Sequence, residues 1–156
     1  MTLPSEPDLT RGRLCGVDYG TVRIGIALTD SRQTLASPHD NYTRRGPVQD
    51  AKYFVELARE ENVAAFVVGL PVHTSGHESQ KSLEARTFGA WLAELTGKPV
   101  VFFDERYTSA EAERWLIDAD LTSKQRKVRL DKLAAQILLS AYLESRNTEP
   151  PQALEG

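Results

Sequence analysis

The 156-residue chain has one cysteine, one methionine and three histidines. The single cysteine, Cys15, excludes a disulfide framework within the chain, and its apolar neighbours predict a small buried side chain. No apolar run reaches the roughly 18 residues that a membrane-spanning helix needs. The start of the chain also lacks the apolar core of a signal peptide. These absences predict a cytoplasmic protein without a membrane partner.

The chain also lacks an excess of basic residues. It has 19 lysines and arginines against 22 aspartates and glutamates, which gives a net charge of −3. This balance argues against nucleic-acid binding through overall charge, but it does not exclude a local basic patch. The sequence contains neither a G-x-x-x-x-G-K-[ST] phosphate loop, nor G-x-G-x-x-G, nor G-x-S-x-G, so it shows no motif for P-loop, dinucleotide or serine-hydrolase chemistry.

The apolar content of 40% and the charged content of 26% are typical of a globular protein, and the length fits one domain. Prolines and polar residues at both ends predict flexible tails over residues 1–11 and 147–156. The remaining residues, 12–146, form the expected domain.

Hydrophobic periodicity predicts an α/β fold with the order β-β-β-α-β-α-β-α-α and a five-stranded mixed sheet flanked by helices. A polar loop is expected from Pro38 to Gly46. The expected strands cover residues 14–18, 23–29, 33–37, 63–70 and 100–103. The expected helices cover residues 47–62, 78–95, 109–117 and 130–143.

Acidic residues follow two of these strands. Asp18 ends the first strand, and Asp104 and Glu105 end the strand that begins at Val100. If these strands are parallel, their carboxyl ends lie at the same edge of the sheet, where α/β proteins bind ligands. Side chains alternate between the two faces of a strand, so only one of Asp104 and Glu105 can join Asp18.

A third acidic residue, Asp131, lies on the apolar side of the last expected helix, one turn before Ala135. Its simplest interpretation is a favourable contact with the positive end of the helix. Three carboxylates brought together would instead repel one another unless they held a cation. Carboxylate oxygens that hold divalent ions are the arrangement of two-metal phosphodiester hydrolysis.

Basic residues precede Asp131 within a short segment. Taken alone, such a cluster is usually part of a solvated loop. Beside a metal-binding acidic site it also suits contact with a nucleic-acid backbone, and Arg106 would extend the same surface. The basic residues of the segment are Lys124, Arg126, Lys127 and Arg129.

Four blocks resemble the YqgF family, also called RuvX, of Holliday-junction-resolvase-like proteins and pre-16S rRNA nucleases. They follow the order of that family and span nearly the whole domain. The most specific is the D-E-R-x-T-S-x-E-A segment. The blocks are GVDYGTVRIGIALTD (16–30), VVGLPVHTSG (67–76), FFDERYTSAEAE (102–113) and KQRKVRLDKLAAQILLSAYL (124–143).

The resemblance implies an RNase H-like fold and a nuclease that depends on Mg²⁺ or Mn²⁺. By residue match, it implies that Asp18, Glu105 and Asp131 are the catalytic, metal-binding carboxylates, which selects Glu105 over Asp104. It also implies a supporting basic role for Arg23, in the D-x-G-x-x-R-x-G pattern. One departure is His73, which stands where many members have asparagine after G-L-P-x.

Two substrates remain open. The family assignment favours processing of the 5′ end of 16S rRNA precursor, and the likeness to resolvases favours four-way DNA. A resolvase cuts two strands symmetrically and is therefore expected to be a homodimer.

Two other classes of function compete with the nuclease. The segment from Asp18 to Thr21 also resembles the phosphate loop of actin-like ATPases and sugar kinases, but those proteins close two domains around a nucleotide and this chain has the length of one. The third class is a non-catalytic nucleic-acid- or ribosome-associated factor.

Overall fold

A computed structural model describes residues 9–71, 79–105 and 122–148, and its centre is a five-stranded sheet in the order β3-β2-β1-β4-β5. The antiparallel part consists of β1 (Arg13–Asp18), β2 (Arg23–Thr29) and β3 (Ala36–Thr43). Both β4 (Val63–Leu70) and β5 (Val100–Asp104) continue the sheet parallel to β1. The expected mixed sheet is confirmed.

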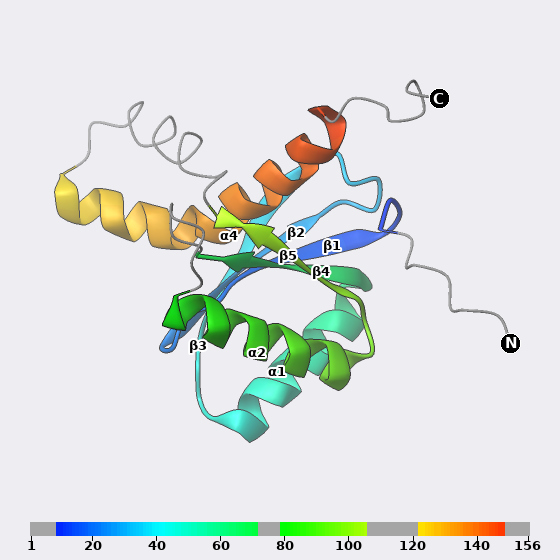
Figure 1. Ribbon diagram of the computed structural model, residues 1–156, viewed down its shortest axis with the longest axis horizontal. Helices are drawn as coiled ribbons and strands as arrows, with labels where there is room; N and C mark the ends of the chain where they lie inside the picture. Colours follow the sequence, from blue (N-terminus) through cyan, green and yellow to red (C-terminus); the bar gives the residue numbers. More distant parts are fainter. Residues whose placement is uncertain (1–8, 72–78, 106–121, 149–156) are drawn as a thin grey trace, which may run out of the picture.

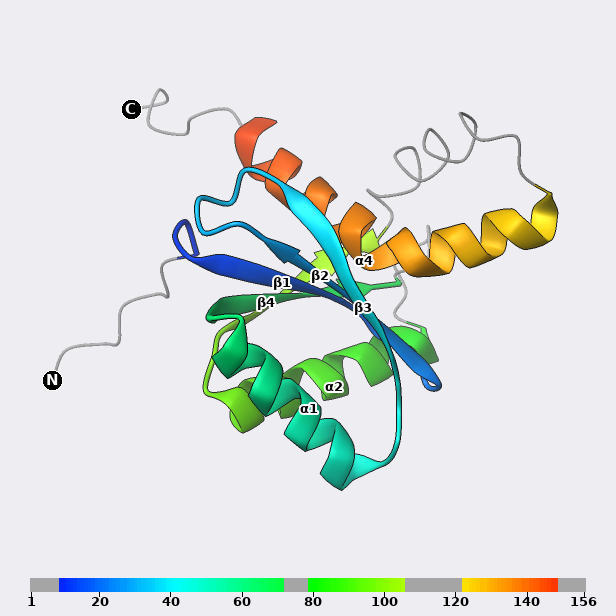
Figure 2. The same ribbon diagram turned by 180° about the vertical axis from the view of Figure 1, so that it is seen from behind.

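Helices cover both faces of this sheet (Figures 1 and 2). One face carries α1 (Pro47–Glu60) and α2 (Gln80–Thr96), and the other carries α4 (Ser123–Thr148). The hydroxyl of Ser79 caps α2 by accepting from the amide of Ser82 at 3.1 Å, and α2 ends where Gly97 adopts φ 71°. Glycine tolerates that left-handed conformation, which is why it stops the helix as expected.

Alternation along β1 divides its side chains between two apolar cores. Cys15 and Val17 belong to the core beneath α1 and α2, whereas Leu14 packs in the core beneath α4 together with Leu139. The side-chain period of two therefore assigns the next residue, Asp18, to the α4 face. The central strand β4 is almost entirely buried because both cores cover it, as its continuous apolar run predicts.

The third strand differs from the expectation of a strand at 33–37 and a loop from Pro38. In the structure β3 covers Ala36–Thr43, so Pro38 lies within it. This strand is at the edge of the sheet, and its pairing with β2 shifts register between Ile26 and Ala27. Proline is tolerated on an edge strand and at such an irregularity of the pairing, where its missing N–H does not interrupt a central ladder. Most of its other side chains are exposed, which hides the strand from a search for apolar alternation.

The last helix begins seven residues earlier than expected, so the basic residues from Lys124 to Arg129 are helical and not in a loop. A capping box starts it. The amide of Gln125 donates to the hydroxyl of Thr122 at 3.2 Å, and the amide of Thr122 donates to the side chain of Gln125 at 2.9 Å. The T-x-x-Q pattern at residues 122–125 is the signal that periodicity alone overlooks.

The remaining sequence predictions concern the helices near the C-terminal end of the chain. The expected helix at 109–117 lies outside the described residues, and α4 continues to Thr148, two residues into the stretch expected to be the C-terminal tail. None of the helices in the described ranges combines the length and the apolar character required to cross a bilayer.

Close packing of α4 on β1 depends on Gly16. A Cβ atom at Gly16 would lie 2.9 Å from the Cβ atom of Leu139 and 3.1 Å from the carbonyl oxygen of Ala135, so α4 would have to move. We expect Gly16→Ala to lower the free energy of unfolding by about 1–3 kcal/mol in chemical denaturation. Gly25→Ala is the control, because its Cβ atom would meet Ala135 at an ordinary 3.5 Å. Equal losses in both variants would contradict this account.

Candidate nuclease site

Two carboxylates meet at the carboxyl edge of the parallel strands. Asp18 is the last residue of β1, and Glu105 directly follows β5. On β5, Phe103 belongs to the core beneath α4, so alternation directs Glu105 to that same face and Asp104 to the opposite one. The structure therefore brings Glu105, and not Asp104, to Asp18.

The proximity of Asp18 contributes to a raised pKa of Glu105. Burial raises it most, and the charge of Asp18 together with a hydrogen bond between the two side chains raises it further, to about 8. Lys81 acts in the opposite direction, and Asp104 adds a smaller increase. Ionising both of two adjacent carboxyl groups is electrostatically unfavourable. Near neutral pH the pair therefore shares a proton unless a cation neutralises it.

Asp131 lies one helical turn before Ala135 on the same side of α4. Ala135 itself packs against the sheet close to Gly25, the residue paired with Asp18 across β1 and β2. The backbone therefore brings residue 131 toward the edge that carries the two carboxylates. The side chain of Asp131 is outside the described part of the structure. Among the described side chains, no cluster of three histidine, cysteine or acidic residues is suitable for a metal ion.

A cavity of about 850 Å³ opens over the two carboxylates. Its wall includes the turn between β1 and β2, the first residues of α2 and the start of α4. Of the predicted nucleic-acid contacts, Arg23 and Lys124 line it. The lining residues are Asp18, Tyr19, Gly20, Thr21, Val22, Arg23, Gly25, Asn41, Pro71, Lys81, Glu84, Ala85, Glu105 and Lys124.

For the other predicted basic residues, the structure describes the backbone alone or does not describe the residue. Arg126, Lys127 and Arg129 lie on the N-terminal part of α4, which extends past the carboxyl edge of the sheet (Figures 1 and 2), and their side chains are outside the description. Arg106, like His73, falls outside the described residues.

Lys81 is a site residue that motif reasoning missed. It is in the first turn of α2 and lines the cavity close enough to Glu105 to lower that residue's pKa. A signal for it exists in the sequence. The helix that follows a buried parallel strand begins at the carboxyl edge of the sheet, so first-turn residues such as Lys81 lie beside any ligand bound there.

The stability of the metal-free protein should fall as pH rises. The pKa of Glu105 is about 8 in the folded chain against an ordinary 4.5, so between these values only the folded state keeps the proton. The stabilisation is complete below pH 4.5 and is lost by about pH 8, with an expected change on the order of 5 kcal/mol. Thermal unfolding in a chelator at several pH values measures it. Glu105→Gln is the control, and an identical pH slope in this variant would contradict the assignment.

The mixed sheet, with paired carboxylates at its carboxyl edge, has the architecture of the RNase H-like class. The chain belongs to the RuvX family, whose model, described as Holliday junction resolvase, matches residues 12–145. The family and the fold expected from the sequence are both confirmed.

Sequence identity to individual relatives supports this family membership. A protein of Rhodopirellula baltica is 50% identical over 134 residues, which is 86% of this chain and 78% of the relative. A protein of Syntrophomonas wolfei is 42% identical over 132 residues, which is 85% of this chain and 94% of the relative. Both are named as candidate pre-16S rRNA nucleases.

Among solved structures, Thermus thermophilus RuvC in complex with a Holliday junction substrate has a similar fold. The TM-score is 0.54 at 14% sequence identity, and the match covers 90% of this chain and 99% of that one. At this identity the likeness concerns the fold.

Proposed function

We propose that the protein is a metal-dependent endonuclease that processes the 5′ end of 16S rRNA precursor in the cytoplasm. The observation that carries the proposal is the contact between Asp18 and Glu105 inside a cavity, with the pKa of Glu105 raised to about 8. Such a pair is electrostatically unfavourable by itself and becomes favourable around a cation.

The donor set fits Mg²⁺ or Mn²⁺, because both ions prefer carboxylate oxygens. Asp18, Glu105 and Asp131 are the residues that would hold the metal. When bound, the metal supplies Lewis acidity and lowers the pKa of water, which is the chemistry that phosphodiester hydrolysis requires.

Basic side chains around the carboxylates have a separate role. Arg23, Lys81 and Lys124 line the cavity and would bind the phosphates on either side of the cleaved bond. Arg126, Lys127 and Arg129 would continue this contact along α4, and Arg106 would add to it from the segment after Glu105. Together they make a local basic surface despite the net charge of −3.

A second candidate substrate is four-way DNA. It is favoured by the description of the family model and by the fold shared with RuvC. Symmetric cutting of a junction requires a homodimer with two-fold symmetry, so this alternative carries a condition on the oligomeric state. Precursor rRNA is preferred because the curated relatives with the high identities given above carry that name.

The experiment compares the two substrates directly. Purified protein is incubated with labelled 16S rRNA precursor and with a labelled four-way junction, each with Mg²⁺, with Mn²⁺ or with a chelator, and its mass in solution is measured. Metal-dependent cutting of the precursor supports the proposal. Cutting of the junction alone by a dimer would replace it with the resolvase. No cutting of either, with binding retained, would leave a non-catalytic factor.

A further inference from the structure

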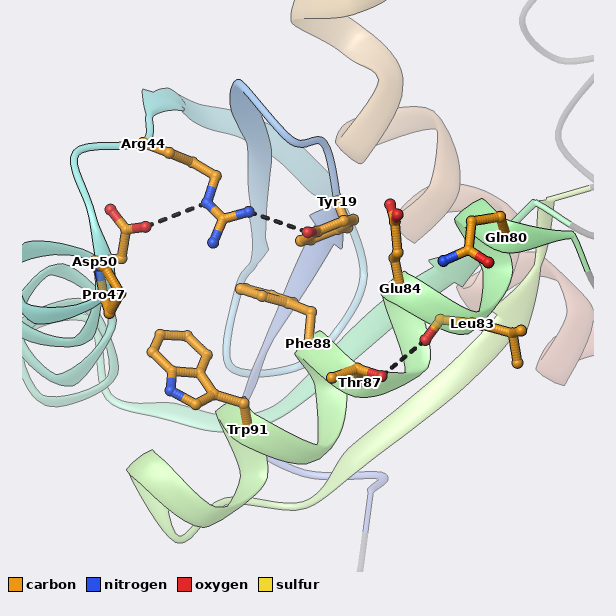
Figure 3. A pocket seen from close by; sticks show the side chains of 10 residues that line it. All are labelled: Tyr19, Arg44, Pro47, Asp50, Gln80, Leu83, Glu84, Thr87, Phe88 and Trp91. Carbon is orange, nitrogen blue, oxygen red and sulfur yellow. Dashed lines mark hydrogen bonds and ion pairs between the residues drawn. The ribbon is translucent and has the colours of Figure 1, made fainter.

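A second pocket lies directly beside the cavity of the two carboxylates. It has a volume of about 390 Å³ and is formed by α2, the start of α1 and the residue that follows β1 (Figure 3). Tyr19 and Glu84 line both the pocket and the cavity, so the two spaces are neighbours across these side chains.

Aromatic rings make up much of this pocket. The ring of Phe88 lies 5.0 Å from that of Tyr19 and 5.4 Å from that of Trp91, measured between centroids. At the rim, Leu83 keeps 50% of its surface exposed, although it is a large apolar residue. Glu84, Gln80 and Thr87 add polar groups around this apolar interior (Figure 3). An aromatic interior with a polar rim suits a flat ligand whose edges carry polar atoms.

Arg44 also lines the pocket, and two hydrogen bonds hold its side chain there. Its Nε donates to Asp50 at 3.2 Å and its Nη1 donates to the hydroxyl of Tyr19 at 3.0 Å. Burial alone would raise the pKa of Asp50, but hydrogen bonds from the Arg45 amide, the Tyr42 hydroxyl and Arg44 hold that pKa below its ordinary value. Asp50 is therefore a fixed anion, and Arg44 is a fixed cation.

The remaining nitrogen of the Arg44 guanidinium, Nη2, has a different environment from Nε and Nη1. Within the described residues it makes no hydrogen bond, and Figure 3 shows it directed into the space above Phe88 and Trp91. A ligand in the pocket would thus meet a positioned donor as well as aromatic faces.

We propose that this pocket binds an unpaired nucleobase of the substrate strand, next to the phosphate that is cleaved. The proposal rests on the proposed nuclease function. Bases stack on aromatic rings, and their edges offer acceptors to an arginine. Tyr19 and Glu84 line both the pocket and the cavity that holds Asp18, so only these side chains separate the two spaces. A phosphate in the cavity and a base in the pocket would therefore belong to the same nucleotide or to adjacent ones.

The pocket gives the enzyme a preference for strands that are unpaired at the cut. A paired base would first have to leave its helix, which costs free energy, whereas an unpaired one enters directly. The carboxylate site by itself reads only the backbone, so the pocket is the element that distinguishes single-stranded from paired segments.

An abasic scan tests the proposal. Single-stranded RNA from the precursor 5′ region is prepared with one abasic position at a time, and its affinity is measured with Ca²⁺ in place of Mg²⁺ to prevent cutting. We expect one position to weaken binding about 10-fold. Thr87→Phe fills the pocket from an exposed helix position, so it should weaken the intact strand by a similar factor and leave that abasic strand unchanged. Ala90→Phe, exposed on the same helix but outside the pocket, is the matched control.

Tryptophan emission provides a measurement that needs no pocket variant. In a Trp115→Phe background Trp91 is the remaining tryptophan of the chain. The intact strand should change its emission, and the strand with the critical abasic position should not. If no abasic position is coupled to Thr87→Phe or to Trp91 emission, the proposal is overturned, and an apolar side chain of a protein partner becomes the better occupant.

The two proposals fail separately in these experiments. Metal-dependent cutting without any coupled abasic position would remove the base pocket and leave the nuclease. A coupled abasic position without cutting of either substrate would retain the base pocket in a protein that binds nucleic acid but does not cleave it.

Discussion

Asp18→Asn is expected to slow cleavage strongly and, at the same time, to stabilise the metal-free protein. The amide cannot supply the negative charge that holds a divalent cation, so the rate should fall on the order of 10³-fold. The same change removes the anion that helps to raise the pKa of Glu105. We expect the free energy of unfolding to increase by about 1–2 kcal/mol in a chelator at pH 8.

The opposite signs of these two effects make the prediction specific. A residue needed only for folding would lose activity and stability together, whereas a metal-binding carboxylate loses activity and gains stability. Glu94→Gln, an exposed carboxylate on α2 away from the cavity, is the control and should change neither. Cleavage assays and thermal unfolding of the three proteins measure both effects. Retained cleavage, or a lower melting temperature in Asp18→Asn, would contradict the proposed role.

Alternation along the strands could be predicted from the sequence, but the face that α4 covers could not. The period of two shows that Asp104 and Glu105 point to opposite faces. Choosing between them requires knowing that Phe103 packs beneath α4, where its ring lies 5.8 Å from that of Tyr142. That contact joins residues 39 positions apart, so local pattern carries no information about it. Family resemblance implied Glu105 by a different route, and its proximity to Asp18 agrees with that choice.

The ends of helices and strands could be predicted from the sequence where the residues that set them are close together in the chain. The apolar run of β4 has the predicted bounds, and Gly97 ends α2 because few other residues tolerate its φ of 71°. The polar edge strand β3 has no such signal, since its order depends on hydrogen bonds to β2. The early start of α4 did have one, the capping box at Thr122 and Gln125, which the basic composition of the following residues obscured.

Contacts between side chains from distant parts of the chain could not be predicted from the sequence. Tyr19, Arg44 and Trp91 come from three separate segments and carry no motif in common. Their pocket exists because the turn after β1, the segment after β3 and the helix α2 meet at one end of the sheet. The arrangement that separates a base site from ordinary core packing is three-dimensional.

Gly69→Ala should impair cleavage about 100-fold with little loss of stability, because Gly69 makes room for the carboxylate of Glu105. A Cβ atom on Gly69 would lie 2.5 Å from Oε1 of Glu105 and 3.0 Å from its Cγ. The side chain of Glu105 can move aside, so the fold tolerates the methyl group, but the carboxylate leaves its position beside Asp18. A displacement near 1 Å in a catalytic site costs about 10²-fold in rate.

The measurement separates this local displacement from general damage. Gly69→Ala should unfold within about 1 kcal/mol of the wild type and bind Mn²⁺ more weakly in calorimetry. Ala64→Ser adds one atom at the other end of β4 and should leave both the rate and the metal affinity unchanged. Unchanged metal affinity and full cleavage in Gly69→Ala would show that Glu105 does not need its observed position, and the metal-binding role proposed for it would then have to be abandoned.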